Sequence, residues 1–331
     1  MHTRRSFSAR LITGSAAALA TSIAVAEPQD KGAASNTKTS RSGSPEHPTR
    51  YHSIDIDGSP IFYREAGAPG APVVLMLHGW PSSSAMFRDL IRELSTDYHV
   101  FAPDYPGFGN SGMPSRSGAG VTFDTLGDVM NKFVDKVGIR QFSLYATDFG
   151  GLVGYRLMLK SPQRVKALIA QNNPLFLSES PWFGPLVPYW KDGTSQSRDK
   201  ARAHYLSAEV VRDLYVVGVR DISLVDPEQW QSDHALLQRP EAAETSLDLL
   251  YDIRTNGATL KAAQEYFAAQ NPPALIVSGK NDILFSGENQ LRYREVLPDA
   301  KIHLMDSGHC ALADKSGEIA ELTREFLRRA I

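Results

Sequence analysis

The chain has 331 residues, of which 42% are hydrophobic, so it is long enough to bury a sizeable core. Its 35 basic and 37 acidic residues give a net charge of −2 without a basic run, which argues against nucleic-acid binding. The one cysteine, Cys310, excludes an intrachain disulfide. These features favour one large α/β domain with an insertion.

The N-terminal residues 1–26 have the pattern of a twin-arginine export signal. Arg4 and Arg5 precede an uncharged stretch of small residues that ends in Ala24-Val25-Ala26, a small-x-small cleavage site. The stretch is shorter than the ~20 residues that span a membrane, so we expect no stable membrane anchor. Residues 27–49 are predicted to be a disordered linker. The sequence thus predicts a periplasmic or secreted protein; the alternative is an accidental arginine pair on a disordered tail.

From residue 51 onward, two opening strands are followed by alternating strand and helix patterns. Residues 51–56 and 61–65 flank the turn Asp57-Gly58 and are typical of a hairpin. The apolar run 73–77 indicates a central strand covered on both faces. The next predicted elements are a helix at 86–94, a strand at 99–102, a helix at 123–137, a strand at 141–145, a helix at 152–158 and a strand at 165–170.

The alternation stops near Asn173, where a stretch rich in Pro, Trp and Tyr begins. It contains short helical patterns such as residues 208–214. The alternation then returns with a strand at 274–278, a helix at 289–296, a strand at 301–305 and a helix at 319–330. A doubly wound, mostly parallel sheet of eight strands, interrupted after the sixth by a helical cap, is the α/β-hydrolase fold. The predicted core is residues 50–172 and 259–331, and the predicted cap is residues 173–258.

The segment Ala-Thr-Asp-Phe-Gly-Gly, residues 146–151, lies between a predicted strand and a predicted helix. Its small residues permit the tight turn known as a nucleophile elbow, which usually carries serine. Here Asp148 takes that position. A carboxylate is already ionised at neutral pH, and its attack on an acyl carbon would give an unfavourable anhydride. Attack on a saturated carbon gives an ester that water can hydrolyse, so Asp148 points to opening an epoxide or displacing a halide.

The expected partners of Asp148 follow later strands. In this fold the acid and the histidine come after the nucleophile, on loops at the carboxyl ends of strands. Asp282 follows strand 274–278 and His309 follows strand 301–305. Backbone N–H groups of Trp80 and Phe149 are the expected oxyanion hole. Singly, Asp148 could be a helix cap, Asp282 a turn residue and His309 a loop histidine, but their joint placement favours a catalytic set.

These motifs resemble the epoxide hydrolase and haloalkane dehalogenase branch of the α/β-hydrolase superfamily. The resemblance covers residues 50–331 and rests on His78-Gly79-Trp80-Pro81, the Asp148 turn, Gly279-Lys280-Asn281-Asp282 and Gly308-His309. It implies a small apolar organic substrate and water, without a metal or organic cofactor. It also implies hydrogen-bond donors from cap tyrosines and an apolar cap wall. The candidates are Tyr215 and Tyr251, with Tyr189, for the donors, and Trp182 and Trp190 for the wall.

Departures from the branch narrow the reaction. Phe149 lacks the indole N–H that haloalkane dehalogenases place after the nucleophile, and the arginines of fluoroacetate dehalogenases are missing at Phe149 and Leu152. We therefore predict an epoxide hydrolase that forms vicinal diols. The alternatives are a haloalkane dehalogenase that uses Trp80 or a cap tryptophan as halide donor, an esterase-like hydrolase, and a non-catalytic ligand-binding relative. The sequence leaves open a monomer or a homodimer.

Overall fold

The computed structural model describes residues 47–114 and 120–331 of the chain. The predicted export signal, residues 1–26, and most of the predicted linker, residues 27–49, lie outside these ranges. Within them, no helix has both the length and the hydrophobicity that a membrane crossing requires.

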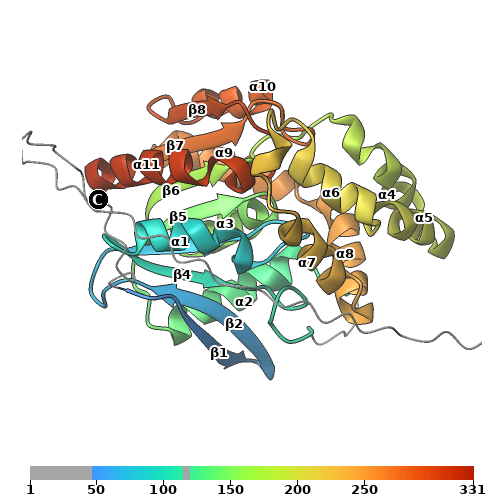
Figure 1. Cartoon of the computed structure of the whole chain (residues 1–331), viewed down its shortest axis with the longest axis horizontal. Helices are drawn as coiled ribbons and strands as arrows, with labels where there is room; N and C mark the ends of the chain where they lie inside the picture. The colour runs from blue at the N-terminus through green and yellow to red at the C-terminus, as the bar shows by residue number, and fades with distance from the viewer. Residues whose placement is uncertain (1–46, 115–119) are drawn as a thin grey trace, which may run out of the picture. The chain divides into compact units, whose positions relative to one another are not determined.

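The described residues form one eight-stranded sheet in the order β1-β2-β4-β3-β5-β6-β7-β8 (Figure 1). The first two pairings, β1 with β2 and β2 with β4, are antiparallel, and the others are parallel. The strands are β1 (Arg50–Ile56), β2 (Ser59–Ala66), β3 (Val73–Leu77), β4 (His99–Pro103), β5 (Phe142–Thr147), β6 (Val165–Gln171), β7 (Ala274–Gly279) and β8 (Lys301–Met305). The predicted mostly parallel, doubly wound sheet is confirmed.

Helices cover both faces of the sheet because its central strands are apolar on both sides. Leu75 and Leu77 of β3 belong to one core cluster, and Val74 and Met76 belong to the other. The first cluster includes side chains of α2 (Phe123–Lys136), α3 (Phe149–Lys160) and α9 (Gly257–Gln270). The second includes side chains of α1 (Arg88–Leu94) and α11 (Leu312–Ala330).

A helical cap is inserted between β6 and β7, as the sequence predicts. Its α-helices are α4 (Val187–Asp192), α5 (Ser195–Tyr205), α6 (Ala208–Val216), α7 (Pro227–Leu237) and α8 (Pro240–Asp252), and they lie together beside one end of the sheet (Figure 1). Several polar contacts join the cap to the core, and two of them involve cap aspartates. Arg88 donates to Asp226 at 2.8 Å, and the Phe123 N–H donates to Asp252 at 2.9 Å. The cap is thus fixed over the carboxyl ends of the strands.

The helix predicted at residues 289–296 differs from the observed structure. This segment holds a short helix, α10 (Gly287–Leu291), followed by one 3₁₀ turn, Arg292–Glu295. Tyr293 is fully buried, and its hydroxyl lies 2.8 Å from that of Tyr155 in α3. A 3₁₀ turn has three residues per turn instead of 3.6, so a break from one helix type to the other rotates the side chains that follow it.

Candidate active site

The turn at Asp148 has the strained backbone of a nucleophile elbow. Asp148 lies between β5 and α3 with φ 49° and ψ −119°, a conformation that costs a non-glycine residue on the order of 1 kcal/mol. Its neighbours must be small. A Cβ at Gly150 would lie 2.1 Å from the Leu77 carbonyl oxygen, and one at Gly151 would lie 2.0 Å from the Asn173 side chain. The Asp148 side chain forms no capping bond with α3, so it is available to a substrate.

The two oxygens of the Asp148 carboxylate have different surroundings. Oδ1 accepts the backbone N–H of Trp80 at 2.7 Å, and the Phe149 N–H also acts on the carboxylate. Oδ2 lies 3.8 Å from Nε2 of His309. The side chain is buried, with the residue 5% exposed. Burial raises the pKa of Asp148, while His309 and the two N–H groups oppose this rise because they favour the charged form.

His309 is held from behind by Asp282. Its Nδ1 lies 3.0 and 3.1 Å from the two oxygens of Asp282, and the histidine is 4% exposed. Burial lowers the pKa of His309, but the charges of Asp282 and Asp148 outweigh this and raise it above its ordinary value. This arrangement places Nδ1–H toward Asp282 and leaves Nε2 facing the nucleophile. The structure therefore brings together the three side chains and two N–H groups that the sequence singled out.

Asn172 is a site residue that the sequence analysis missed. It follows β6 directly, has a φ of 42°, and its side-chain amide donates to Asp282 at 2.7 Å and to the Gly308 carbonyl at 3.3 Å. Its backbone N–H donates to Ser278 at 3.0 Å. Asn172 thus joins the ends of three strands behind the histidine. A usable signal was an asparagine immediately after a buried strand, because asparagine tolerates a positive φ.

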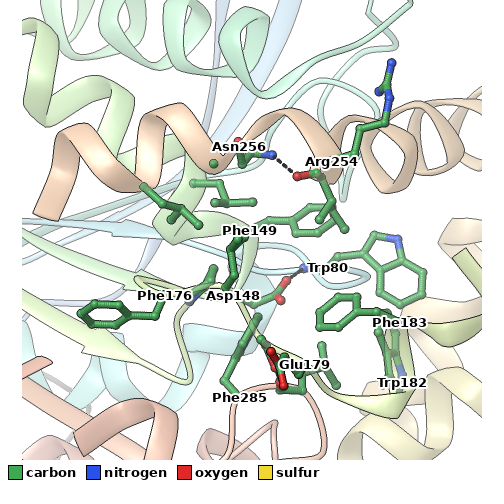
Figure 2. A pocket seen from close by; sticks show the side chains of 18 of the residues that line it. Trp80, Asp148, Phe149, Phe176, Glu179, Trp182, Phe183, Arg254, Asn256 and Phe285 are labelled. Carbon is green, nitrogen blue, oxygen red and sulfur yellow. Dashed lines mark hydrogen bonds between the residues drawn. The ribbon is translucent and has the colours of Figure 1, made fainter. Parts of the chain in front are cut away.

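A cavity of about 400 Å³ opens over Asp148. Its wall is mostly aromatic and aliphatic, and Figure 2 shows the Asp148 carboxylate among these rings. The apolar lining residues include Trp80, Phe149, Leu152, Phe176, Trp182, Phe183, Trp190, Leu260, Leu284 and Phe285. Trp182 and Trp190 therefore lie in the wall, as predicted. Among the described residues, no group of three or more His, Cys, Asp or Glu side chains is placed to hold a metal ion.

The structure does not bring the three predicted cap tyrosines to this wall. In the described part of the chain, Tyr189, Tyr215 and Tyr251 are not among the residues that line the cavity. The Tyr215 hydroxyl donates to Asp233, and the Tyr189 hydroxyl accepts from Arg198. The Tyr251 ring packs against Tyr189 at 4.6 Å between centroids. These contacts hold the cap helices to one another.

One polar group in the wall lacks a partner. The indole N–H of Trp80 is buried and has no hydrogen-bond partner among the described atoms. The ring lies edge-on to that of Trp182, at 6.1 Å between centroids, and Trp80 itself lines the cavity. A buried donor without an acceptor carries a desolvation cost that a ligand can remove. The same residue thus presents its backbone N–H to Asp148 and keeps its indole N–H unused.

Comparison with known proteins agrees with this fold. The family model for the alpha/beta hydrolase fold matches residues 72–316. The chain therefore belongs to the α/β-hydrolase fold family. It is 37% identical to an uncharacterized hydrolase of Saccharomyces cerevisiae, over 82% of this chain and 95% of that protein.

Two further similarities concern haloalkane dehalogenases and their fold. The chain is 39% identical to a haloalkane dehalogenase of Bradyrhizobium diazoefficiens, over 34% of this chain and 35% of that protein. The crystal structure of DBJA superposes with a TM-score of 0.69 at 22% identity, covering 85% of this chain and 97% of that one. The first similarity covers about a third of each chain and agrees with the branch of the superfamily that the motifs indicate, and the second supports the fold alone.

Proposed function

We propose that this chain is a hydrolase that forms a covalent ester on Asp148, and that its substrate is an epoxide, which it converts to a vicinal diol. The observation that carries the proposal is that the two oxygens of Asp148 have different hydrogen-bonding surroundings. Oδ1 is held by the Trp80 N–H at 2.7 Å, whereas Oδ2 lies 3.8 Å from Nε2 of His309. A carboxylate held in this way has one oxygen that can attack the substrate and another that can hold the negative charge when the ester is hydrolysed.

In the first step, Oδ2 attacks a saturated ring carbon of the epoxide from the side opposite the C–O bond. That bond breaks, its electron pair moves to the departing oxygen, and the alkoxide takes a proton from solvent water to become a hydroxyl. The product is an alkyl ester of Asp148. The cavity suits this step because its apolar wall excludes water and leaves the carboxylate poorly solvated.

In the second step, Nε2 of His309 takes a proton from water, and the resulting hydroxide attacks the ester carbon of Asp148. Oδ1 is now the carbonyl oxygen of the ester, so the negative charge develops on the oxygen that already accepts the Trp80 N–H, and the Phe149 N–H, which also acts on the carboxylate, is the second donor. The ester bond breaks, the diol leaves with the proton from His309, and Asp148 releases the proton of the added hydroxyl to solvent and becomes a carboxylate again. Asp282 stabilises the histidine while it carries that proton.

Haloalkane dehalogenation is the second candidate, and the unpartnered indole N–H of Trp80 favours it. A halide leaves without needing a proton, so an N–H donor is enough to stabilise it. The relative from Bradyrhizobium diazoefficiens is named a haloalkane dehalogenase. Against this candidate, Phe149 follows the nucleophile, so the turn itself supplies no second indole donor. The epoxide is therefore the first choice.

The test uses His309→Gln, which should permit the first step and stop the second. The variant is mixed with styrene oxide, 1,2-epoxyhexane or 1-bromobutane, and its intact mass is measured. An epoxide adduct adds the whole substrate mass, whereas a haloalkane adduct adds the substrate mass less that of hydrogen bromide. Asp148→Asn is the control and should form neither. If wild-type protein turns over any of these compounds but the histidine variant never carries an adduct, the covalent mechanism is wrong.

A further inference from the structure

A buried carboxylate in the cap, Asp233, has no part in the chemistry described above. It lies on α7, is 5% exposed, and accepts a hydrogen bond from the Tyr215 hydroxyl of α6. The charged group that acts on it is another carboxylate, Asp104, and not a cation. Burying a carboxylate without a basic partner is costly, and an apolar pair of similar size would pack without that cost. The buried charge therefore indicates that Asp233 has a role other than stabilising the cap.

The Asp233–Tyr215 pair contacts the loop of Trp80. The Ser82 hydroxyl, two residues after Trp80, interacts with both the Asp233 carboxylate and the Tyr215 hydroxyl. Ser82 is buried in the same loop whose backbone N–H binds Oδ1 of Asp148. A shift of Asp233 would therefore be passed to the N–H group that faces the nucleophile.

The same cap segment also contacts the loops of His309 and Asp282. The N–H of Cys310 donates to the Leu214 carbonyl at 3.3 Å, and the Asn281 side chain donates to the Gly218 carbonyl at 2.9 Å. Gly308 packs so closely that a Cβ there would lie 2.0 Å from the Val217 carbonyl oxygen. Residues 214–218, with Tyr215 among them, thus touch both loops next to the catalytic histidine and its acid.

We propose that Asp233 is a positioning residue that joins the cap to the loops of Trp80, His309 and Asp282. The position of the cap then determines how the groups that hydrolyse the ester are placed. The proposal rests on the function proposed above. Asp233 holds Tyr215 and Ser82 together, and the segment after Tyr215 holds the histidine loop. At this pair, α6, α7 and the loop of Trp80 meet through polar side chains.

Protonation is expected to weaken this junction. Burial raises the pKa of Asp233 to about 6, against the hydrogen bonds from Tyr215 and Ser82, which lower it. The groups that face it are Tyr215 from α6, Ser82 from the loop after β3, Asp104 from the loop after β4 and the Cys310 thiol after β8. A neutral carboxyl accepts weaker hydrogen bonds from two hydroxyls than a carboxylate does. Ester hydrolysis should then need both Asp233 and His309 in their deprotonated forms.

The experiment compares Asp233→Asn with Asp226→Asn in the full chain. Asp226 is a matched control, because it caps the N-terminus of α7 and also joins the cap to the core, through Arg88 at 2.8 Å, but away from the catalytic loops. The probe is styrene oxide, or 1-bromobutane if that compound gives the adduct. Asp233→Asn should slow ester hydrolysis roughly tenfold to a hundredfold while alkylation changes little, and Asp226→Asn should change neither.

A pH profile separates positioning from simple stability. Below about pH 6, log kcat of the wild type should fall with a slope near 2, and that of Asp233→Asn with a slope near 1, because one of the two protonations is lost. If Asp233→Asn does not fold, Tyr215→Phe removes the same hydrogen bond and serves instead. Unchanged hydrolysis in a folded variant that still forms the adduct overturns this inference and leaves the proposed function standing. A missing adduct in His309→Gln overturns the function itself.

Discussion

The amide of Asn172 offers a sharp test of how the acid behind the histidine is held. Asn172→Gly removes the side chain but keeps the backbone, because glycine adopts the φ of 42° without strain. The lost bond to Asp282, 2.7 Å long and to a charged group, contributes about 1.5–3 kcal/mol, and the bond to Gly308 about 1 kcal/mol. The flexibility of glycine in the unfolded chain adds about 0.5–1 kcal/mol. The free energy of unfolding should fall by roughly 3–5 kcal/mol.

The same substitution should slow one catalytic step selectively. Without the amide, Asp282 is held by the Leu284 N–H at 2.7 Å and by His309, so both the acid and the histidine gain freedom. Hydrolysis of the ester depends on His309, whereas its formation by Asp148 does not involve the histidine. The ester should therefore accumulate during turnover of styrene oxide, and its fraction is read by intact mass against time.

Two further substitutions at Asn172 separate the effect of backbone strain from the effect of the lost amide. Asn172→Ala adds the strain of a left-handed backbone, so it should be about 1 kcal/mol less stable than the glycine variant. Asn172→Asp keeps the shape but places a second carboxylate against Asp282, so it should lower activity the most. Urea unfolding at pH 7 measures the stabilities. A glycine variant that unfolds within 1 kcal/mol of the wild type and accumulates no ester would refute the role assigned to Asn172.

Three other predictions follow from the site. Trp80→Phe keeps the backbone N–H but loses the indole donor, so alkylation should slow roughly tenfold while ester hydrolysis is spared, as rapid-mixing kinetics would reveal; equal slowing of both steps would contradict it. Gly79→Ala puts a Cβ 2.6 Å from that of Asp148, so adduct formation should be abolished in a protein that still folds by circular dichroism. Burial raises the pKa of Asp233 from 3.8 to about 6, so folding favours its neutral form. The free energy of unfolding is therefore highest below pH 4, and it falls by at most roughly 3 kcal/mol as the pH rises through 6 and the buried carboxyl becomes charged. The unfolding free energy of Asp233→Asn should lack this decline, and parallel pH curves for the two proteins would count against it.

Patterns within short segments predicted most of the fold. The elbow was readable because Gly150 and Gly151 touch the backbone of β3 and the side chain of Asn173, contacts that any larger residue would break. The role of Asn172 was not readable, because it depends on Asp282 and Gly308, which lie more than a hundred residues further along the chain.

The cap tyrosines were beyond the sequence for a different physical reason. Helical periodicity predicts which face of a helix is buried, but a buried face of the cap contacts either the cavity or another cap helix. Tyr215 is buried against Asp233, eighteen residues further along the chain, and the periodicity of α6 is the same in both cases. Only the packing of α6 on α7 decides where the hydroxyl points.

The burial of Asp148 sets two demands that oppose each other. A nucleophilic carboxylate reacts faster when it is poorly solvated, but burial raises the pKa of Asp148 and so favours the neutral form, which does not attack. The N–H groups of Trp80 and Phe149 and the charge of His309 offset this cost, and the Trp80 N–H does so at Oδ1. The same donors then bind the charge on Oδ1 during ester hydrolysis. Because these donors are backbone groups, the conformation of their loops determines where they point. The cap contacts at Ser82 and Cys310 lie outside the cavity, but they hold these loops and therefore affect ester hydrolysis.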